Sequence, residues 1–225
     1  MVTLVFVSFT FVVLADKASS QTVETFRDNF TSISYSGNNG SLNWSGSWQE
    51  WGESNGATSG SVQVATSDRC SGGSGNCLRI GSDGGALSNH GASRTADLTN
   101  AISATLSFGY RRQIQGQVSG SVTVQVSSNG GSSWTTLTTI SFSGPQKAST
   151  AAFDIGEYTG SNTVVRFRGS GPGINGYLYI DSVGVTADMA ASTTTTPVVT
   201  TTRPTPTTST TPGSSTTTVP GATTS

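Results

Sequence analysis

Three of the four tryptophans of the chain lie in the segment NWSGSWQEWGES, at positions 43–54. An exposed indole can stack on the pyranose ring of a sugar, whereas a buried indole packs in a core. If SWQEW forms a strand, Trp48 and Trp51 point to opposite faces of it, and Trp44 shares the parity of Trp48. We expect Trp44 and Trp48 in the core, because three exposed indoles would promote aggregation. Trp51 is then the candidate ligand contact.

A second group of side chains that could bind a ligand lies near the end of the chain. Arg166 and Arg168 alternate with apolar residues in TVVRFR, and Tyr177 and Tyr179 alternate with apolar residues in GYLYID. If these two strands pair, all four side chains share one exposed face. Arginine guanidinium groups beside tyrosine rings could bind a glycan or an acidic peptide. Alternatively, the four residues only cover the sheet through cation–π and cross-strand contacts.

The sequence offers little for catalysis. A glycoside hydrolase would need two carboxylates facing each other across a cleft. Glu50 and Glu53 are close in sequence, but their odd spacing places them on opposite faces of a strand. His90, the only histidine, lies in the polar loop SNHGAS, without the partners of a zinc site or a catalytic triad. We expect no enzymatic activity, with a glycoside hydrolase as the alternative.

Composition excludes one class of partner. Only 10% of the 225 residues are charged and the net charge is −1, whereas roughly 25% charged residues is usual in globular proteins. The few Lys and Arg residues are scattered along the chain. A nucleic-acid partner would require a basic stripe, so we expect no nucleic-acid binding.

Both ends of the chain differ from its middle. Residues 1–20 begin with the apolar run MVTLVFVSFTFVVLA, which predicts a signal peptide, with an uncleaved anchor as the alternative. No membrane span is expected in the mature chain. Residues 191–225 are rich in Thr, Ser and Pro, which is typical of an extended linker or stalk in an exported protein. A downstream domain could follow. These features predict a secreted or cell-surface protein.

Two kinds of covalent feature fit this export. Cys70 and Cys77 enclose the short segment SGGSGN, and an even cysteine count in an exported chain favours a disulfide. The sequons at Asn29, Asn39 and Asn43 would permit N-glycosylation in a host that has the pathway.

The segment between these ends, residues 21–190, shows the period of strands rather than helices. Val122, Val124 and Val126 share one face of SVTVQV, and the polar residues between them share the other. Similar short segments recur between Gly, Ser and Asn clusters, and Asn129-Gly130 marks a hairpin turn. This pattern predicts an all-β fold, a two-layer antiparallel β-sandwich in which each sheet has one buried face.

The last predicted strand changes parity. Leu178 and Ile180 are apolar on one parity, and Val183 and Val185 are apolar on the other. Both halves can face the core only if the strand absorbs an extra residue, as in a β-bulge. The bulge would lie near Asp181 and would change the direction of its carboxylate.

The order of several short motifs resembles a known family. FRDNF near the start, the tryptophan segment, GALSNHGASRTADL, TLSFGYR, SSWTTL and YLYIDSVGV follow one another over residues 25–186. This order is similar to that of MAM-like jelly-roll β-sandwich modules of extracellular multidomain proteins. The family's four-cysteine pattern is missing, so the chain looks closer to the bacterial-type relatives. The resemblance implies a non-catalytic module for adhesion, assembly or glycan contact.

The resemblance also implies a structural calcium ion where the first strand meets the last. Asp28 of FRDNF and Asp181 of YIDSV match the family's two acidic positions, and Glu50 is a further candidate ligand. Calcium takes six to eight oxygen ligands, which carboxylates, backbone carbonyls and waters could supply. In the alternative interpretation, Asp28 caps a turn and Asp181 accepts hydrogen bonds from the bulge.

Together, these observations predict an exported β-sandwich module on a Thr/Pro-rich stalk. Its partner would be an extracellular glycan, or a surface protein if the module serves protein–protein adhesion without glycan binding. The sequence leaves its oligomeric state open.

Overall fold

The computed structural model describes residues 21–70, 75–83, 85–115, 119–171 and 175–191. Within these ranges the chain is almost entirely strand. The strands are β1 (Thr22–Asp28), β2 (Gln49–Trp51), β3 (Val62–Thr66), β4 (Asn76–Asp83), β5 (Gly91–Ala96), β6 (Ala101–Ile114), β7 (Ser121–Ser127), β8 (Thr135–Ser141), β9 (Ser149–Asp154), β10 (Thr163–Ser170) and β11 (Asn175–Met189), and Gly156–Tyr158 forms a short 3-10 helix, η1.

The predicted terminal segments stay predictions. The signal peptide, residues 1–20, and the linker, residues 191–225, lie outside the described residues except for Ala191. Within the described part of the chain, no helix has the length and hydropathy that crossing a membrane requires.

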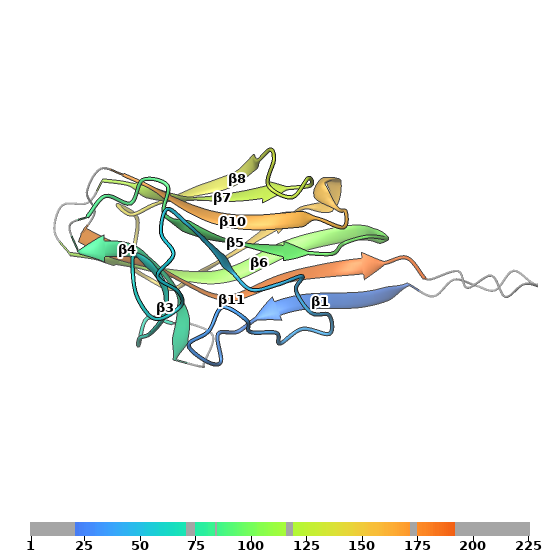
Figure 1. Ribbon diagram of the computed structural model, residues 1–225, viewed down its shortest axis with the longest axis horizontal. Coiled ribbons are helices and arrows are strands. Elements are labelled where there is room, and N and C mark those ends of the chain that lie inside the picture. The colour runs from blue at the N-terminus through green and yellow to red at the C-terminus, as the bar shows by residue number, and fades with distance from the viewer. Residues whose placement is uncertain (1–20, 71–74, 84, 116–118, 172–174, 192–225) are drawn as a thin grey trace, which may run out of the picture. The chain divides into compact units, whose positions relative to one another are not determined.

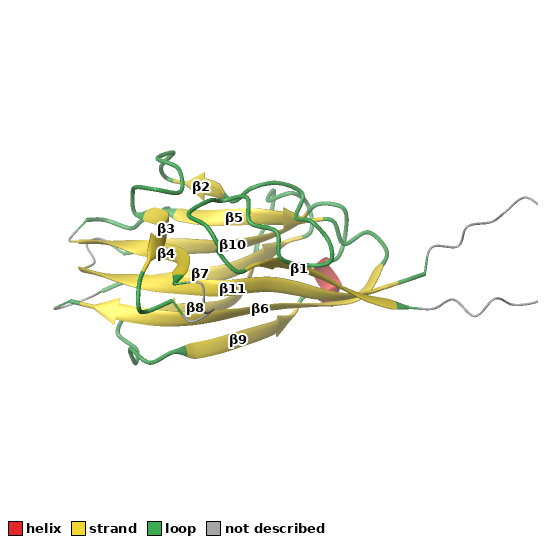
Figure 2. Cartoon of the chain, turned by 90° about the horizontal axis from the view of Figure 1, so that it is seen from below, coloured by secondary structure: helices red, strands yellow, loops and turns green. Residues whose placement is uncertain are grey.

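Two antiparallel sheets form a sandwich (Figure 1). One has the order β3-β4-β11-β6-β9, with β1 also paired to β11, and the other has the order β2-β5-β10-β7-β8. From β4 to β7, each consecutive strand changes sheet, and so does each from β8 to β11. This interleaving of eight strands is the jelly-roll arrangement, and it confirms the predicted fold class. Figure 2 shows β2 and β9 at opposite margins of the sandwich.

Alternating side chains build the core between the sheets. Val122, Val124 and Val126 of β7 are all fully buried, as are Leu106 of β6 and Phe167 of β10. Each such side chain removed from water contributes about 1.5–3 kcal/mol. Because successive residues of a strand point to opposite faces, the polar residues between them form the outer faces of the sandwich.

The predicted bulge lies in β11. The pairing of β11 with β6 shifts register between Asp181 and Gly184, and Ser182 has a left-handed φ of 51°. The shift places Leu178 and Val183 in the same core although their parities differ. It also marks a change of neighbour: β4 pairs with β11 up to Ile180, and β1 pairs with it beyond the bulge.

The predicted disulfide is also present. Cys70 and Cys77 are bonded to each other, so the crosslink joins the chain shortly after β3 to the start of β4. Cys77 is fully buried and packs with Tyr177 and Tyr179 of β11. The bond therefore closes the edge hairpin of β3 and β4, and Cys77 packs it against the outer face of the six-stranded sheet.

Candidate functional site

The tryptophans divide as their parity predicts. Trp44 and Trp48 are buried, with 4% and 2% of their surface exposed, whereas Trp51 is 42% exposed. The Trp48 ring packs against Phe30 and Phe167 inside the sandwich. Trp51 instead lies on the outer face of the five-stranded sheet, on its edge strand β2. Two of the clustered tryptophans therefore belong to the scaffold, and one is available to a ligand.

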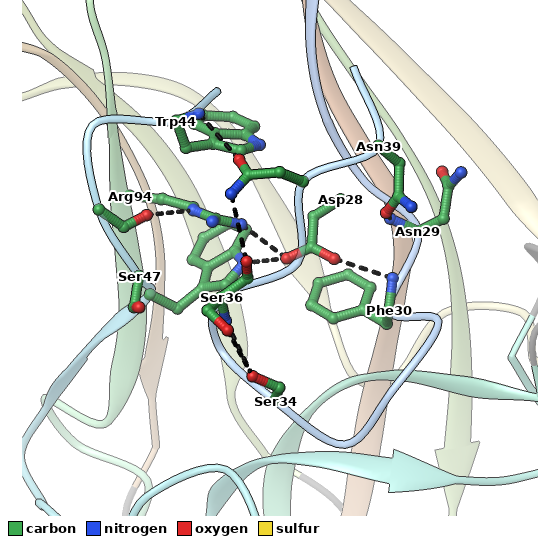
Figure 3. A network of polar contacts seen from close by, with 12 residues as sticks. Asp28, Asn29, Phe30, Ser34, Ser36, Asn39, Trp44, Ser47 and Arg94 are labelled. Atoms are coloured by element: carbon green, nitrogen blue, oxygen red, sulfur yellow. Dashed lines mark hydrogen bonds and ion pairs between the residues drawn. The ribbon is translucent and has the colours of Figure 1, made fainter. Parts of the chain in front are cut away.

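A buried ion pair occupies the space beside the core tryptophans (Figure 3). Asp28 at the end of β1 accepts a hydrogen bond from Arg94 of β5 at 2.6 Å, and both side chains are fully buried. Because β1 and β5 belong to different sheets, the pair links the two layers. The Arg94 guanidinium also lies 5.1 Å from the Trp44 ring centroid and 5.8 Å from that of Trp48.

The oxygens of Asp28 are fully engaged. The Phe30 amide donates to one oxygen at 2.9 Å, and the Trp48 indole and Arg94 donate to the other. Burial raises the pKa of the Asp28 carboxyl, and the hydrogen bonds with the Arg94 charge offset part of that rise. Burial likewise lowers the pKa of Arg94. The ion pair is therefore structural, because Asp28 and Arg94 balance each other's charge in the interior.

The predicted calcium ligands do not assemble. Among the described residues, no three His, Cys, Asp or Glu side chains lie where they could hold a metal ion together, so Asp28, Asp181 and Glu50 do not form a three-carboxylate set. Asp28 caps the turn at Phe30, and Asp181 accepts a hydrogen bond from the Ser182 amide of the bulge at 2.7 Å. These contacts agree with the alternative interpretation. Because Arg94 already balances the charge of Asp28, the donor set does not fit a calcium ion there.

The exposed Trp51 belongs to a group of side chains on the outer face of the five-stranded sheet. The rings of Trp51 and Trp134 meet edge to face, with centroids 6.4 Å apart. The Arg166 guanidinium lies 5.0 Å from the Trp51 ring centroid and 3.6 Å from that of Trp134. We call the set of Trp51, Gln125, Trp134, Arg166 and Arg168 the Trp–Arg patch.

Strand register brings these distant residues together. Two adjacent cross-strand rows run over the outer face from β2 to β8. One row contains Gln49, Ser93, Arg166, Gln125 and Thr136, and the other contains Trp51, Gly91, Arg168, Thr123 and Thr139. Opposite residues in such rows contact each other directly. The patch is therefore fixed by the sheet itself.

Hydrogen bonds hold the patch in place. The Trp51 indole donates to the Ser93 hydroxyl at 2.8 Å. Arg166 donates through Nε and Nη2 to the Gln125 side-chain carbonyl, at 3.1 and 2.7 Å, and Gln125 donates to the Thr136 hydroxyl. Because each rotamer is fixed before any ligand arrives, binding would cost little side-chain entropy.

The patch is cationic. Burial and repulsion from the nearby Arg168 lower the pKa of Arg166 to about 10. Neither guanidinium forms an ion pair with a carboxylate of the described residues; Arg168 instead donates to the side-chain carbonyl of Asn89. The charge of Arg166 thus lies beside the two indole rings, Arg168 follows two residues later on β10, and amide oxygens are the acceptors of both.

Sequence reasoning missed two residues of the patch, Gln125 and the second indole, Trp134. It precedes β8 directly, after the turn that joins β7 to β8. Gly131 lies in that turn with a φ of 90°, and a Cβ there would lie 3.0 Å from the Trp134 ring. The signal was available, because the Asn129-Gly130 hairpin places the start of β8 beside Gln125. Trp134 could therefore have been assigned to the same surface.

The predicted Arg–Tyr surface is wrong. Arg166 and Arg168 lie on β10 in the five-stranded sheet, whereas Tyr177 and Tyr179 lie on β11 in the six-stranded sheet. Strands that follow each other in sequence belong to different layers here, as the jelly-roll topology requires. Tyr177 and Tyr179 are also only 7% and 6% exposed. The tyrosines lie on the outer face of the six-stranded sheet instead.

That second face is covered by its own side chains. The Arg79 guanidinium lies 4.3 Å from the Tyr177 ring centroid, and the Tyr179 hydroxyl donates to Gln113 at 2.7 Å. The tyrosines also pack with Cys77. These contacts agree with the alternative in which the residues only cover the sheet.

The candidate catalytic residues have structural partners. Glu50 accepts hydrogen bonds from the Tyr35 hydroxyl and the Gly56 amide, and Glu53 accepts from the amides of Ser61 and Val62. Burial and the Glu50 carboxylate raise the pKa of Tyr35. The expectation of opposite faces is wrong, because Glu53 lies beyond β2 and both carboxylates line one hollow beside Trp48. They act there as acceptors for the backbone of the loop that follows β2.

The remaining predicted positions lie on loops near the ends of strands. His90 directly precedes β5, and its carbonyl accepts a hydrogen bond from the Gly169 amide at 2.7 Å. Of the three sequon asparagines, Asn39 and Asn43 are exposed and Asn29 is half-buried. The Asn29 amide donates to the Asn39 side-chain carbonyl at 2.9 Å. Glycosylation of these residues stays a prediction.

Comparison with known proteins yields similarity at the level of the fold. No protein-family model matches the sequence, and no curated protein matches it. The adhesin domain of Lys-gingipain from Porphyromonas gingivalis is similar with a TM-score of 0.49 and 18% identity, over 72% of this chain and 96% of that one. The CBM22-1 xylan-binding domain of Xyn10C from Paenibacillus barcinonensis has a TM-score of 0.47 and 14% identity, over 79% of this chain and 100% of that one.

A third similar structure is a carbohydrate-binding module of family 61 in complex with β-1,4-galactotriose. Its TM-score is 0.45 at 11% identity, over 61% of this chain and 86% of that one. Similarity at this level carries no conclusion about the ligand of this chain. Membership of the MAM-like family specifically stays a prediction.

Proposed function

We propose that the chain is a non-catalytic extracellular module that binds glycans on the Trp–Arg patch. The observation that carries this proposal is the exposed Trp51 beside Trp134, on the outer face of the five-stranded sheet, with Arg166 between the rings. An amphipathic surface of this kind matches a sugar, whose ring presents C–H groups on its faces and hydroxyls at its rim.

Polar side chains surround the rings at the right places to meet those hydroxyls. Thr123, Thr136 and Thr139 lie in the same cross-strand rows as the patch, and Gln49 lies beside Trp51 on β2. Hydroxyl and amide groups can both donate and accept hydrogen bonds. The surface therefore combines stacking with polar readout over several strands, which favours a chain of sugars over a single one.

The contacts of the carboxylates Glu50 and Glu53 favour a binding function without catalysis. A glycoside hydrolase needs one carboxyl as an acid and a second one as a base or nucleophile. Glu50 of β2 and Glu53 of the loop beyond it hold backbone amides instead, and neither belongs to the Trp–Arg patch. Two indoles that meet edge to face, with no carboxylate in the patch, can hold a glycan but cannot protonate its glycosidic oxygen.

An extracellular location is part of the proposal. The disulfide between Cys70 and Cys77 persists in oxidising compartments and is rare in the cytosol. The apolar run at residues 1–20 and the Thr/Pro-rich segment at residues 191–225 are typical of export and of a stalk.

A glycan array probed with the full chain tests the proposal. We expect binding to a limited set of polysaccharides and loss of that binding in Trp51→Ala. Ile102→Ala is the matched control, because Ile102 is 56% exposed on β6 of the other sheet. A flat array, or binding that survives in Trp51→Ala, would overturn the proposal and leave protein–protein adhesion as the function to examine.

A further inference from the structure

The charge of the Trp–Arg patch narrows its ligand class. Arg166 and Arg168 are two residues apart on β10, so both point to the outer face of the sheet. Their mutual repulsion is one of the two causes that lower the pKa of Arg166. A protein that needs only rigidity on this face could use neutral side chains. No carboxylate of the described residues pairs with either arginine, so the two like charges together would attract an anion.

The hydrogen bonds of the two arginines leave capacity for a ligand. Each guanidinium has five N–H donors. Gln125 accepts from two donors of Arg166, and Asn89 accepts from one of Arg168. Both acceptors are neutral amide oxygens, which orient a guanidinium without neutralising it. An anion would gain charge-assisted hydrogen bonds, which are about twice as strong as neutral ones.

The geometry places these charges at a useful distance from the stacking ring. Trp51 and Arg168 lie in one cross-strand row with Gly91 between them. Alternate strands of a sheet are about 10 Å apart, and Gly91 has no side chain to fill the gap. The β5 and β10 backbones approach closely here, since a Cβ on Gly91 would lie 2.2 Å from the Phe167 carbonyl oxygen. A sugar stacked on Trp51 can therefore direct its neighbours along the row toward Arg168.

Resting on the proposed glycan-binding function, we propose that the Trp–Arg patch selects anionic glycans, with a carboxylate or sulfate group of the polysaccharide bound by Arg168 and the accessible edge of Arg166. The sugar ring that carries or adjoins the anionic group lies on Trp51. Neutral glycans of the same backbone fill the stacking position but leave the two positive charges unbalanced.

Paired polymers test this selectivity with the full chain. Affinity electrophoresis and calorimetric titration would use polygalacturonate, alginate and a sulfated galactan as probes. Each is compared with its neutral counterpart, which is the carboxyl-reduced polymer for the two uronates and the desulfated galactan for the third. We expect at least one anionic polymer to bind about tenfold or more tightly than its neutral counterpart. The polymer that binds then shows whether carboxylate or sulfate is the group recognised.

Two variants assign the effect to the patch. Arg168→Gln should weaken binding of the preferred anionic polymer about tenfold and leave the melting temperature unchanged, because Arg168 is exposed. Lys147→Gln is the matched control, since it removes one exposed charge from the loop before β9 of the other sheet. It should change the binding less than twofold, because a distant exposed charge is largely screened.

The outcomes separate this inference from the proposed function. Equal binding of the anionic and neutral members of every pair would overturn the selectivity while the module still binds glycans. Equal losses in Arg168→Gln and Lys147→Gln would also overturn it, because the attraction would then depend on net charge alone. If no polymer of either kind binds, both proposals fail.

Discussion

Two arginines on opposite faces of the five-stranded sheet make similar contacts with tryptophan and have opposite roles. Arg94 of β5 faces the core and lies beside Trp44 and Trp48. Arg166 of the neighbouring strand β10 faces outward and lies beside Trp51 and Trp134. The register pairs Arg166 with Ser93, the residue next to Arg94, so the two arginines are close in the sheet but point in opposite directions.

The difference between them is the partner. Arg94 has a buried carboxylate at 2.6 Å, and the pair ties β1 to β5 across the two layers. Arg166 has the neutral amide of Gln125. A buried charge without a counter-charge is costly, so the inner arginine depends on Asp28. The outer arginine is only 7% exposed, but no carboxylate of the described residues pairs with it, so its charge is not balanced within the sheet. The counter-charge thus makes the inner Trp–Arg arrangement part of the scaffold, and its absence leaves the outer arrangement as the candidate site.

The largest expected effect is on the inner pair. Asp28→Asn leaves Arg94 buried without its counter-charge, and we expect a loss of about 3–5 kcal/mol in the free energy of unfolding. Chemical denaturation measures it. Arg168→Gln is the matched variant, because Arg168 is an exposed arginine of the outer face, and it should cost less than about 1 kcal/mol. Similar losses in both variants would contradict the division of roles.

Trp48 and Trp51 allow the same comparison between a side chain of the core and one of the outer face. Trp48→Ala should destabilise the fold by about 3–5 kcal/mol, because it leaves a large cavity in the core. Trp51→Ala should change stability by less than about 1 kcal/mol but cost about 2 kcal/mol in glycan binding, roughly a 30-fold loss. Thermal melting and titration of both variants give the two numbers. A Trp51→Ala variant that unfolds early but binds normally would reverse the assignment.

The pH dependence of binding follows from the charge of the outer arginine. Arg166 is protonated below its pKa of about 10, so binding of an anionic glycan should weaken as the pH rises through that value. A uronate ligand loses its own charge below about pH 3.5, so binding should also weaken under acid conditions. Titration across the range should therefore give a plateau between about pH 5 and 9. A neutral glycan whose affinity follows the same profile would contradict this explanation.

The smallest expected effect concerns calcium. Because Arg94 balances the charge of Asp28, we expect EDTA and added calcium to leave the melting temperature unchanged within about 1 °C. Differential scanning calorimetry measures this. A melting temperature that falls with EDTA, recovers with calcium and loses this response in Asp181→Ala would restore the predicted cation site at the bulge.

The sequence pattern correctly predicted the features that depend only on residues within one strand. The alternation of Val122, Val124 and Val126, the parity change at Asp181 and the opposite parities of Trp48 and Trp51 are properties of single strands. The structure confirms each of them. The fold class was therefore predictable, because short segments determine the hydrophobic period, the turns and the side of each strand that is buried.

Long-range pairing could not be predicted in the same way. The sequence neighbours β10 and β11 belong to different sheets, so Tyr177 and Arg166 do not share a surface. The ion pair of Asp28 with Arg94 joins residues 66 positions apart, and no local signal specifies it. Three of the five residues of the Trp–Arg patch were identified from sequence: Trp51, Arg166 and Arg168. The hairpin signal could have placed Trp134 beside Gln125 on one face, but the topology was needed to join both residues to Trp51 and to remove the tyrosines.

The most direct test of a glycan-binding outer face is one titration series with the anionic polysaccharide that the full chain binds most tightly. The wild type, Trp51→Ala and Ile33→Ala would be titrated by calorimetry in the same buffer; Ile33 is 48% exposed and lies outside the Trp–Arg patch. We predict that Trp51→Ala loses about 30-fold in affinity while Ile33→Ala binds as the wild type does. Equal affinity of all three proteins would contradict the account.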